Sequence, residues 1–170
     1  IVIPRDSRPD EQQVRAQRLA ALGLAQVIQP RDLTPQRLAS AILAELAEMN
    51  DEPILVGHSF GGSMILKTMA EEPEQTAAAA GLFLIAAPYW GNQDWDVSEY
   101  ELPEDFAAQL PANLPIFLYH SRDDEWVPFE HQQIYAEKLP QATVRQFDGR
   151  GHQFNNDLSE VAADIASLNP

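Results

Sequence analysis

Short apolar runs alternate with amphipathic stretches along the chain. The apolar runs predict six buried strands, at residues 1–4, 25–29, 53–56, 81–86, 115–119 and 143–147. Apolar residues at helical spacing predict helices at about 10–22, 35–49, 60–71, 103–110, 129–139 and 158–168. Because apolar strands separated by helices are typical of a parallel sheet covered on both faces, the pattern predicts one α/β domain over residues 1–170, with a doubly wound, mainly parallel sheet of about six strands.

The start of one helix is marked by its polar and proline residues. Thr34 followed by Pro35 is typical of an N-cap and the first helical position. The apolar residues that then predict one buried face of this helix are Leu38, Ile42, Leu46 and Met49.

Residues 88–113 interrupt the regular alternation of strands and helices. They predict an acidic, aromatic insertion near the site, in a fold with a minimal cap. No basic residue occurs between Lys67 and Arg122. Aromatic side chains over a pocket would favour apolar groups, and the negative charge would disfavour anionic substrates. An ordinary surface loop whose tryptophans pack on the core is equally compatible with the sequence. The candidate pocket residues in and near this segment are Tyr89, Trp90, Trp95 and Trp126.

Composition narrows the classes of partner. The chain has 170 residues, a formal charge of −15 and no cysteine. This charge would be repelled by nucleic acid and by anionic membranes, so neither is expected as a partner. The sequence has no apolar run of the length of a membrane span and no signal-peptide pattern. We expect a cytoplasmic protein, although a start at Ile1 rather than Met leaves open a trimmed, recombined or engineered chain.

The segment G-H-S-F-G at Gly57 to Gly61 matches the nucleophile-elbow pattern G-x-S-x-G, directly after a predicted strand and before a predicted helix. In that context Ser59 is the candidate nucleophile, held on a sharp turn. The small residues Gly57, Gly61 and Gly62 are expected to let the helix pass close to the strand. The Phe60 N–H is the expected oxyanion donor, supported by the helix N-terminus.

A serine nucleophile needs a base and an orienting carboxylate. The chain contains four histidines, namely His58, His120, His131 and His152. We expect His152 to be the base, because its glycine-rich turn D-G-R-G-H-Q-F follows the last predicted strand. His58 is expected to face away from the nucleophile in a structural role or at the pocket wall, and His131 to lie on an exposed helix. The carboxylate is expected in S-R-D-D-E-W-V-P, where Asp123 and Asp124 are both candidates.

The order serine, aspartate, histidine is the one used by α/β-hydrolases. The segments I-L-V-G-H-S-F-G-G, L-F-L-I-A-A-P, S-R-D-D-E-W-V-P-F-E-H-Q-Q and F-D-G-R-G-H-Q-F resemble this superfamily over about residues 51–165, and in particular the small serine hydrolases of the retinoblastoma-binding protein 9 type. The resemblance implies Asp124 as the acid, with Asp123 in reserve. It also implies hydrolysis of small esters or amides without a metal or cofactor.

Residues 1–46 depart from the hydrolase pattern. The glycine-rich loop that usually follows the first strand, and supplies a second oxyanion donor, is replaced by V-I-P-R-D-S-R-P-D. This part of the chain resembles the C-terminal tail of a GT-B glycosyltransferase, which supplies the same order of strands and helices. Completeness of the oxyanion hole is therefore open.

Three functions are compatible with these observations. The leading hypothesis is a serine esterase that takes a small, neutral or apolar acyl substrate and uses Ser59, His152 and Asp124. The second is a catalytically impaired, hydrolase-fold binding protein. The third is a chimeric glycosyltransferase and hydrolase chain.

Overall fold

A computed structural model describes residues 17–18, 20–22, 33–91 and 97–168 of the protein. By its contacts the chain divides into two compact units, Ile1–Glu45 and Leu46–Pro170, and each is considered by itself. The strands predicted at 1–4 and 25–29 lie outside the described residues. Organisation as a single domain stays a prediction.

Helix α2 (Pro35–Glu48) begins where the sequence predicts. The Thr34 hydroxyl accepts a hydrogen bond from the Arg37 N–H at 3.1 Å, as an N-cap does. Leu38 and Ile42 are buried. Met49 was expected on the same face, but the helix ends at Glu48 and Met49 is 53% exposed.

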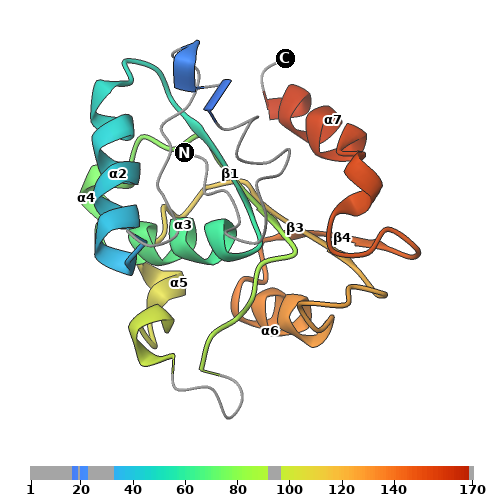
Figure 1. The fold of residues 1–170 in the computed structure, drawn as a ribbon. Coiled ribbons are helices and arrows are strands. Elements are labelled where there is room, and N and C mark those ends of the chain that lie inside the picture. Colours follow the sequence, from blue (N-terminus) through green and yellow to red (C-terminus); the bar gives the residue numbers. More distant parts are fainter. Residues whose placement is uncertain (1–16, 19, 23–32, 92–96, 169–170) are drawn as a thin grey trace. The chain divides into compact units, whose positions relative to one another are not determined.

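The second unit contains a parallel sheet of four strands in the order β1-β2-β3-β4 (Figure 1). The strands are β1 (Ile54–His58), β2 (Gly81–Ile85), β3 (Ile116–Ser121) and β4 (Thr143–Phe147). These four strands correspond to the last four of the six strand segments that the sequence predicts. The α/β class and the parallel sheet are confirmed, and the described sheet is smaller than the one predicted.

Helices lie between successive strands, as parallel pairing requires, and α7 follows β4. They are α3 (Phe60–Glu71), α4 (Pro73–Thr76), α5 (Phe106–Gln109), α6 (Glu130–Lys138) and α7 (Ser159–Leu168), with short 3-10 turns at Ser98–Tyr100 and Phe154–Asn156. Helix α4 was not predicted, because its four residues are too few to show a hydrophobic period. The helix expected at 103–110 shortens to α5.

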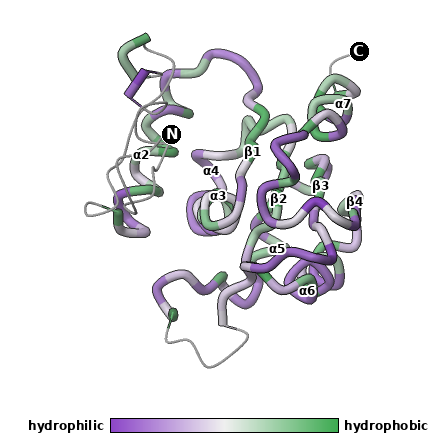
Figure 2. Tube along the Cα trace, turned by 45° about the vertical axis from the view of Figure 1, so that its right-hand side comes forward, coloured by the Kyte–Doolittle hydropathy of each residue, from purple (hydrophilic) through white to green (hydrophobic). Residues whose placement is uncertain are grey.

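Alternating side chains of the central strands build two cores. Leu82 and Leu84 of β2 pack in a cluster with residues of α3, α5 and α6, whereas Phe83 and Ile85 pack in a second cluster with residues of α7. The sheet is thus covered on both faces (Figure 1). Strands β2 and β3 are buried along their whole length, whereas β4, predicted as a buried strand, has three exposed residues and none buried. In Figure 2 the tube of α6 is largely hydrophilic.

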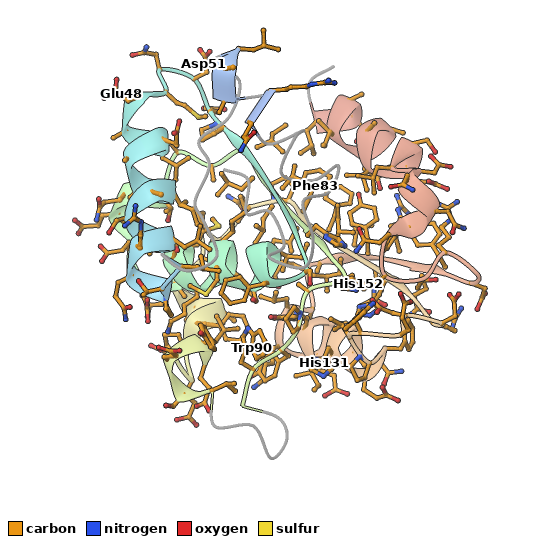
Figure 3. All side chains as sticks on the ribbon, in the orientation of Figure 1. Glu48, Asp51, Phe83, Trp90, His131 and His152 are labelled. Atoms are coloured by element: carbon orange, nitrogen blue, oxygen red, sulfur yellow. The ribbon has the colours of Figure 1, made fainter. Side chains whose placement is uncertain are left out.

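The core on the α7 side contains stacked aromatic rings. Phe83 and Phe117 lie with ring centroids 4.6 Å apart and planes 9° from parallel, and Phe83 is labelled in Figure 3. Tyr119 extends the stack at 6.2 Å from Phe83. Its hydroxyl donates to Asp164 of α7 at 2.8 Å, and Asp164 also pairs with Arg145 of β4. Burial raises the pKa of Tyr119, so the hydroxyl stays a donor.

Within the described part of the chain, no helix combines the length and the apolar character needed to cross a membrane.

Replacing Tyr119 by phenylalanine should lower the free energy of unfolding by about 1 kcal/mol, because the ring stays stacked while one hydrogen bond is lost. Urea denaturation followed by circular dichroism measures the change. An unchanged midpoint would show that the bond to Asp164 contributes nothing to stability.

Candidate active site

The turn between β1 and α3 holds Ser59 in an unusual backbone conformation. Ser59 has φ 54° and ψ −131°, in the region that residues with a side chain rarely adopt. Its N–H donates to the Ile85 carbonyl at 2.8 Å, and its carbonyl accepts from the Gly62 N–H at 2.9 Å. The turn therefore presents the Ser59 side chain at the carboxyl end of the sheet, as a nucleophile elbow does.

Two of the three glycines around Ser59 are required by close contact. A Cβ atom added at Gly57 would lie 2.4 Å from the Gly62 Cα, and one added at Gly62 would lie 2.8 Å from the Gly57 carbonyl oxygen. The expectation for Gly61 was wrong, because a Cβ there meets no described atom within 4 Å. Helix α3 therefore approaches β1 most closely at Gly62, and the Gly61 carbonyl carbon would lie 3.0 Å from a Cβ added at Gly57.

Ser59, His152 and Asp124 lie in one chain of hydrogen bonds. The Ser59 Oγ is 3.0 Å from the His152 Nε2, and the His152 Nδ1 is 2.8 Å from the Asp124 Oδ2. The Nδ1–H donates to the carboxylate, which leaves Nε2 to accept from the serine hydroxyl. The side chains of His152 and Asp124 are 2% and 0% exposed, so their contact is shielded from water, while Ser59 is partly exposed.

The Asp124 carboxylate is fixed by its own loop. Its Oδ1 accepts the N–H groups of Trp126 and Val127, each at 2.9 Å. Asp123, the reserve candidate, points elsewhere, since its Oδ1 accepts from the Ser121 hydroxyl and from the Gly149 N–H. These donors, Ser121 first, hold the pKa of Asp123 below its usual value. Asp123 therefore ties the loop after β3 to the loop after β4.

The loop that carries His152 is built from left-handed residues. Gly149 and Gly151 have positive φ values of 73° and 56°. Three further residues, Phe154, Asn155 and Asn156, also have positive φ. Hydrogen bonds offset this strain, among them one from the Asn155 side chain to the Gly149 carbonyl at 2.9 Å.

Two further contacts brace the same loop. Arg150 forms two hydrogen bonds with Glu160 of α7, and this contact lowers the pKa of Glu160 to about 2. The Nε2–H of His58 donates to the His152 carbonyl at 2.8 Å, and the two rings lie 4.8 Å apart. His58 therefore points to the backbone of the His152 loop, consistent with its expected structural role.

Three neighbours of the candidate site were missed in the sequence. The His120 Nε2 is 2.9 Å from the Val127 carbonyl and 3.3 Å from the Asp124 Oδ2. His131, labelled in Figure 3, was expected to be exposed but is 6% exposed and accepts the Tyr89 N–H at 2.7 Å. The Glu125 carboxylate accepts the His152 N–H at 3.2 Å.

The spacing of apolar residues in the sequence could have indicated that both histidines, His120 and His131, are buried. His120 follows Ile116 and Leu118 at the spacing of one face of β3, and His131 precedes Tyr135 and Leu139 at helical spacing. Burial lowers the pKa of each imidazole, so both are neutral at pH 7.

The aromatic residues expected to line a pocket have different surroundings in the structure. The Trp90 indole N–H donates to the Ser63 hydroxyl at 2.9 Å, and the Trp90 ring lies 6.2 Å from Phe60 and 5.4 Å from Tyr100. Tyr89 instead packs edge-on against Tyr135 in the core. Trp126 is 63% exposed beside Asp124, and Trp95 lies outside the described residues.

The candidate oxyanion donor, the Phe60 N–H, lies at the elbow. Phe60 is the first residue of α3, and its N–H has no acceptor among the described residues, as is usual for the first turn of a helix. The loop expected to supply a second donor lies outside the described residues. In the described part of the chain, no three metal-ligating side chains form a cluster. The arrangement can transfer a proton from the Ser59 hydroxyl to His152 while Asp124 orients the imidazole.

Comparison with known proteins identifies related sequences and folds. The model of a family described as serine hydrolase matches residues 5–158. The sequence has no significant match among curated proteins.

Several solved structures share the fold. A putative YdeN-like hydrolase from Pectobacterium atrosepticum has 19% identity and a TM-score of 0.64, with 98% of this chain and 87% of that chain covered. Est1E from Butyrivibrio proteoclasticus has 15% identity and a TM-score of 0.65, with coverages of 98% and 84%. A predicted CIB-like hydrolase from Thermoplasma acidophilum has 18% identity and a TM-score of 0.56, with 78% of this chain covered; the match spans 57% of that protein's length. These similarities show an α/β-hydrolase fold.

Substitution of Gly57 by alanine should destabilise the protein by about 1–3 kcal/mol or more, because its Cβ would overlap the backbone of Gly62. Gly61→Ala is the matched control: its Cβ meets no described atom, and alanine favours a helix by up to about 1 kcal/mol. Thermal unfolding of both variants measures the difference. Equal melting temperatures would refute the assigned contact.

The free energy of unfolding should fall as the pH drops below about 6.5, the pKa of a histidine in an unfolded chain. The folded-state pKa values of His120 and His131 are lower, so the unfolded chain takes up protons first. Each histidine contributes a slope of at most about 1.4 kcal/mol per pH unit. Urea titrations between pH 7.5 and 5 measure this slope, and His131→Gln should reduce it. A slope that His131→Gln leaves unchanged would contradict the role of buried His131.

Proposed function

Because the chain belongs to the serine hydrolase family, we propose that it cleaves small carboxylic esters through an acyl-enzyme formed on Ser59. The observation that carries the proposal is the 3.0 Å contact of the Ser59 Oγ with the His152 Nε2, continued at 2.8 Å from the His152 Nδ1 to Asp124. A hydroxyl, a base and an orienting acid in this order form the arrangement that activates a serine.

In the proposed reaction the Ser59 Oγ attacks the ester carbonyl while the His152 Nε2 takes the hydroxyl proton. The Asp124 carboxylate stabilises the imidazolium that forms. His152 then returns the proton to the alcohol that leaves, and the acyl group stays on Ser59. A water molecule, deprotonated by His152, attacks the acyl-enzyme, releases the acid and restores the serine.

The developing oxyanion is proposed to bind the Phe60 N–H at the start of α3. This donor costs no reorganisation, because the elbow holds it without another acceptor among the described residues. A second donor in the loop after residues 1–4 would be worth about 3 kcal/mol in the transition state. The sequence of that loop, V-I-P-R-D-S-R-P-D, lacks the usual glycines.

An apolar or aromatic acyl group fits the surroundings of the elbow. The rings of Phe60, Trp90 and Tyr100 contact one another next to the nucleophile, and all three are partly exposed. Est1E, one of the proteins of similar fold, is known with ferulic acid bound. The acidic side chains at Glu99 and Glu101 would repel an anionic acyl group.

Some of the finer predictions belong to the proposal as well. The motifs favour a relation to the retinoblastoma-binding protein 9 type within the serine hydrolases. The family match starts at residue 5 and so includes most of residues 1–46, and their resemblance to a glycosyltransferase tail is not confirmed. A cytoplasmic location, the absence of a cofactor and a single-domain chain stay predictions.

Replacing Ser59 by alanine should lower the hydrolysis rate of 4-nitrophenyl acetate by about 10⁴-fold or more, because the nucleophile is removed. A fluorophosphonate probe should label the wild-type chain at Ser59, located by peptide mass spectrometry. Ser167→Ala, on α7, is the matched control and should keep both the rate and the label. A folded wild-type chain with neither turnover nor label would overturn the proposal and favour the hydrolase-fold binding protein.

A further inference from the structure

We propose that His120 is a positioning residue, which holds the Asp124 carboxylate in line with His152 from inside the core. The inference rests on the proposed function, because it assigns a role in orienting the acid of that site. His120 is the last but one residue of β3, four positions before Asp124. It approaches the carboxylate from the side of the sheet that α6 covers.

The hydrogen bonds around His120 define which atom donates. The Nε2 lies 2.9 Å from the Val127 carbonyl and 3.3 Å from the Asp124 Oδ2, and both of these are acceptors. The Nε2 therefore carries the proton and donates it to the Val127 carbonyl, while the Asp124 Oδ2 lies 3.3 Å from the same nitrogen. Because Val127 also donates its N–H to the Asp124 Oδ1 at 2.9 Å, His120 contacts both ends of the turn that grips the carboxylate.

Each carboxylate oxygen then has a defined task. Oδ1 accepts two backbone N–H groups, from Trp126 and Val127. Oδ2 is the closer acceptor for His152, and His120 is the described side chain on its other side. The two backbone donors on Oδ1 set the plane of the carboxylate, and His120 supports the Val127 end of the turn that supplies them.

The charge state of His120 suits this task. Burial lowers its pKa, and the nearest charged and titratable groups are Asp124 and His152 from the neighbouring loops and Glu130 and His131 from α6. A neutral imidazole donates a hydrogen bond without placing a full positive charge against Asp124. The carboxylate can thus keep its charge for the imidazolium of His152.

Two substitutions test the hydrogen-bond donor of His120 and its aromatic ring one at a time. His120→Phe keeps a planar ring, which packs at present edge-on against Phe129 with centroids 5.8 Å apart, and removes the donor. A small cavity of about 10 Å³ lined by His120, Gln132 and Tyr135 lies beside this ring. His120→Gln keeps an amide donor at about the position of Nε2. Tyr119→Phe, on the adjacent residue of β3 and the opposite face, is the control for loss of a buried hydrogen bond alone.

The full-length variants are compared by hydrolysis of 4-nitrophenyl acetate. His120→Phe should lower kcat by about 10- to 100-fold with KM within about twofold, which is less than the loss on removing a triad member. His120→Gln should recover most of this loss, and Tyr119→Phe should keep the wild-type kcat. Equal kcat values for His120→Phe and Tyr119→Phe would overturn the inference.

A second measurement does not depend on turnover. The His152 Nδ1 proton, bonded to a carboxylate, should give a far-downfield proton resonance in a ¹⁵N-labelled chain. His120→Phe should shift this resonance upfield or broaden it, whereas His120→Gln and Tyr119→Phe should leave it in place. If wild-type protein shows no hydrolysis, the esterase proposal fails while the resonance still decides the role of His120. Should His120→Phe not fold, His120→Met removes the donor with a flexible side chain, and an unchanged resonance in it would refute the role.

Discussion

The close approach of β1 and α3 is the constraint on which the candidate site depends. Gly57 and Gly62 meet where a single added Cβ would come within 2.4 Å of backbone. This contact forces the chain to turn within Ser59, which takes a positive φ at a cost on the order of 1–3 kcal/mol. The strain persists because both flanking elements are anchored, β1 by pairing with β2 and α3 by buried residues such as Leu66 and Met69.

The parallel register of the sheet brings the other groups to the same edge. Ser59 follows β1, Asp124 follows β3 and His152 follows β4, so all three leave the sheet at its carboxyl end. Each loop is then fixed differently. A strained elbow holds the serine, a turn of backbone donors holds the aspartate, and a left-handed run braced by α7 holds the histidine. The geometry is therefore a property of the sheet and of three loops that are also bonded to one another.

The sequence predicted much of this arrangement, and its failures have physical causes. Apolar runs located four described strands within a few residues. The motif order indicated Ser59, an aspartate and His152, and the family resemblance selected Asp124; the structure brings these three within hydrogen-bond distance. The environment of His131 was mispredicted because α6 is polar nearly throughout, so its short buried face gives a weak periodic signal. Gly61 was expected to be necessary because a glycine in the sequence does not by itself indicate whether its Cα faces the neighbouring strand. The contact of His120 with Asp124 depends on a turn geometry that spacing does not encode.

The separation of Ser59 and His152 along the chain has a consequence for biosynthesis. The two residues that share a hydrogen bond are 93 positions apart, and the loop of the second is braced by α7, the last described helix. A ribosome therefore releases the elbow long before its partner. Ser59 of a nascent chain therefore lacks the His152 contact until 93 further residues have been added and the His152 loop has packed.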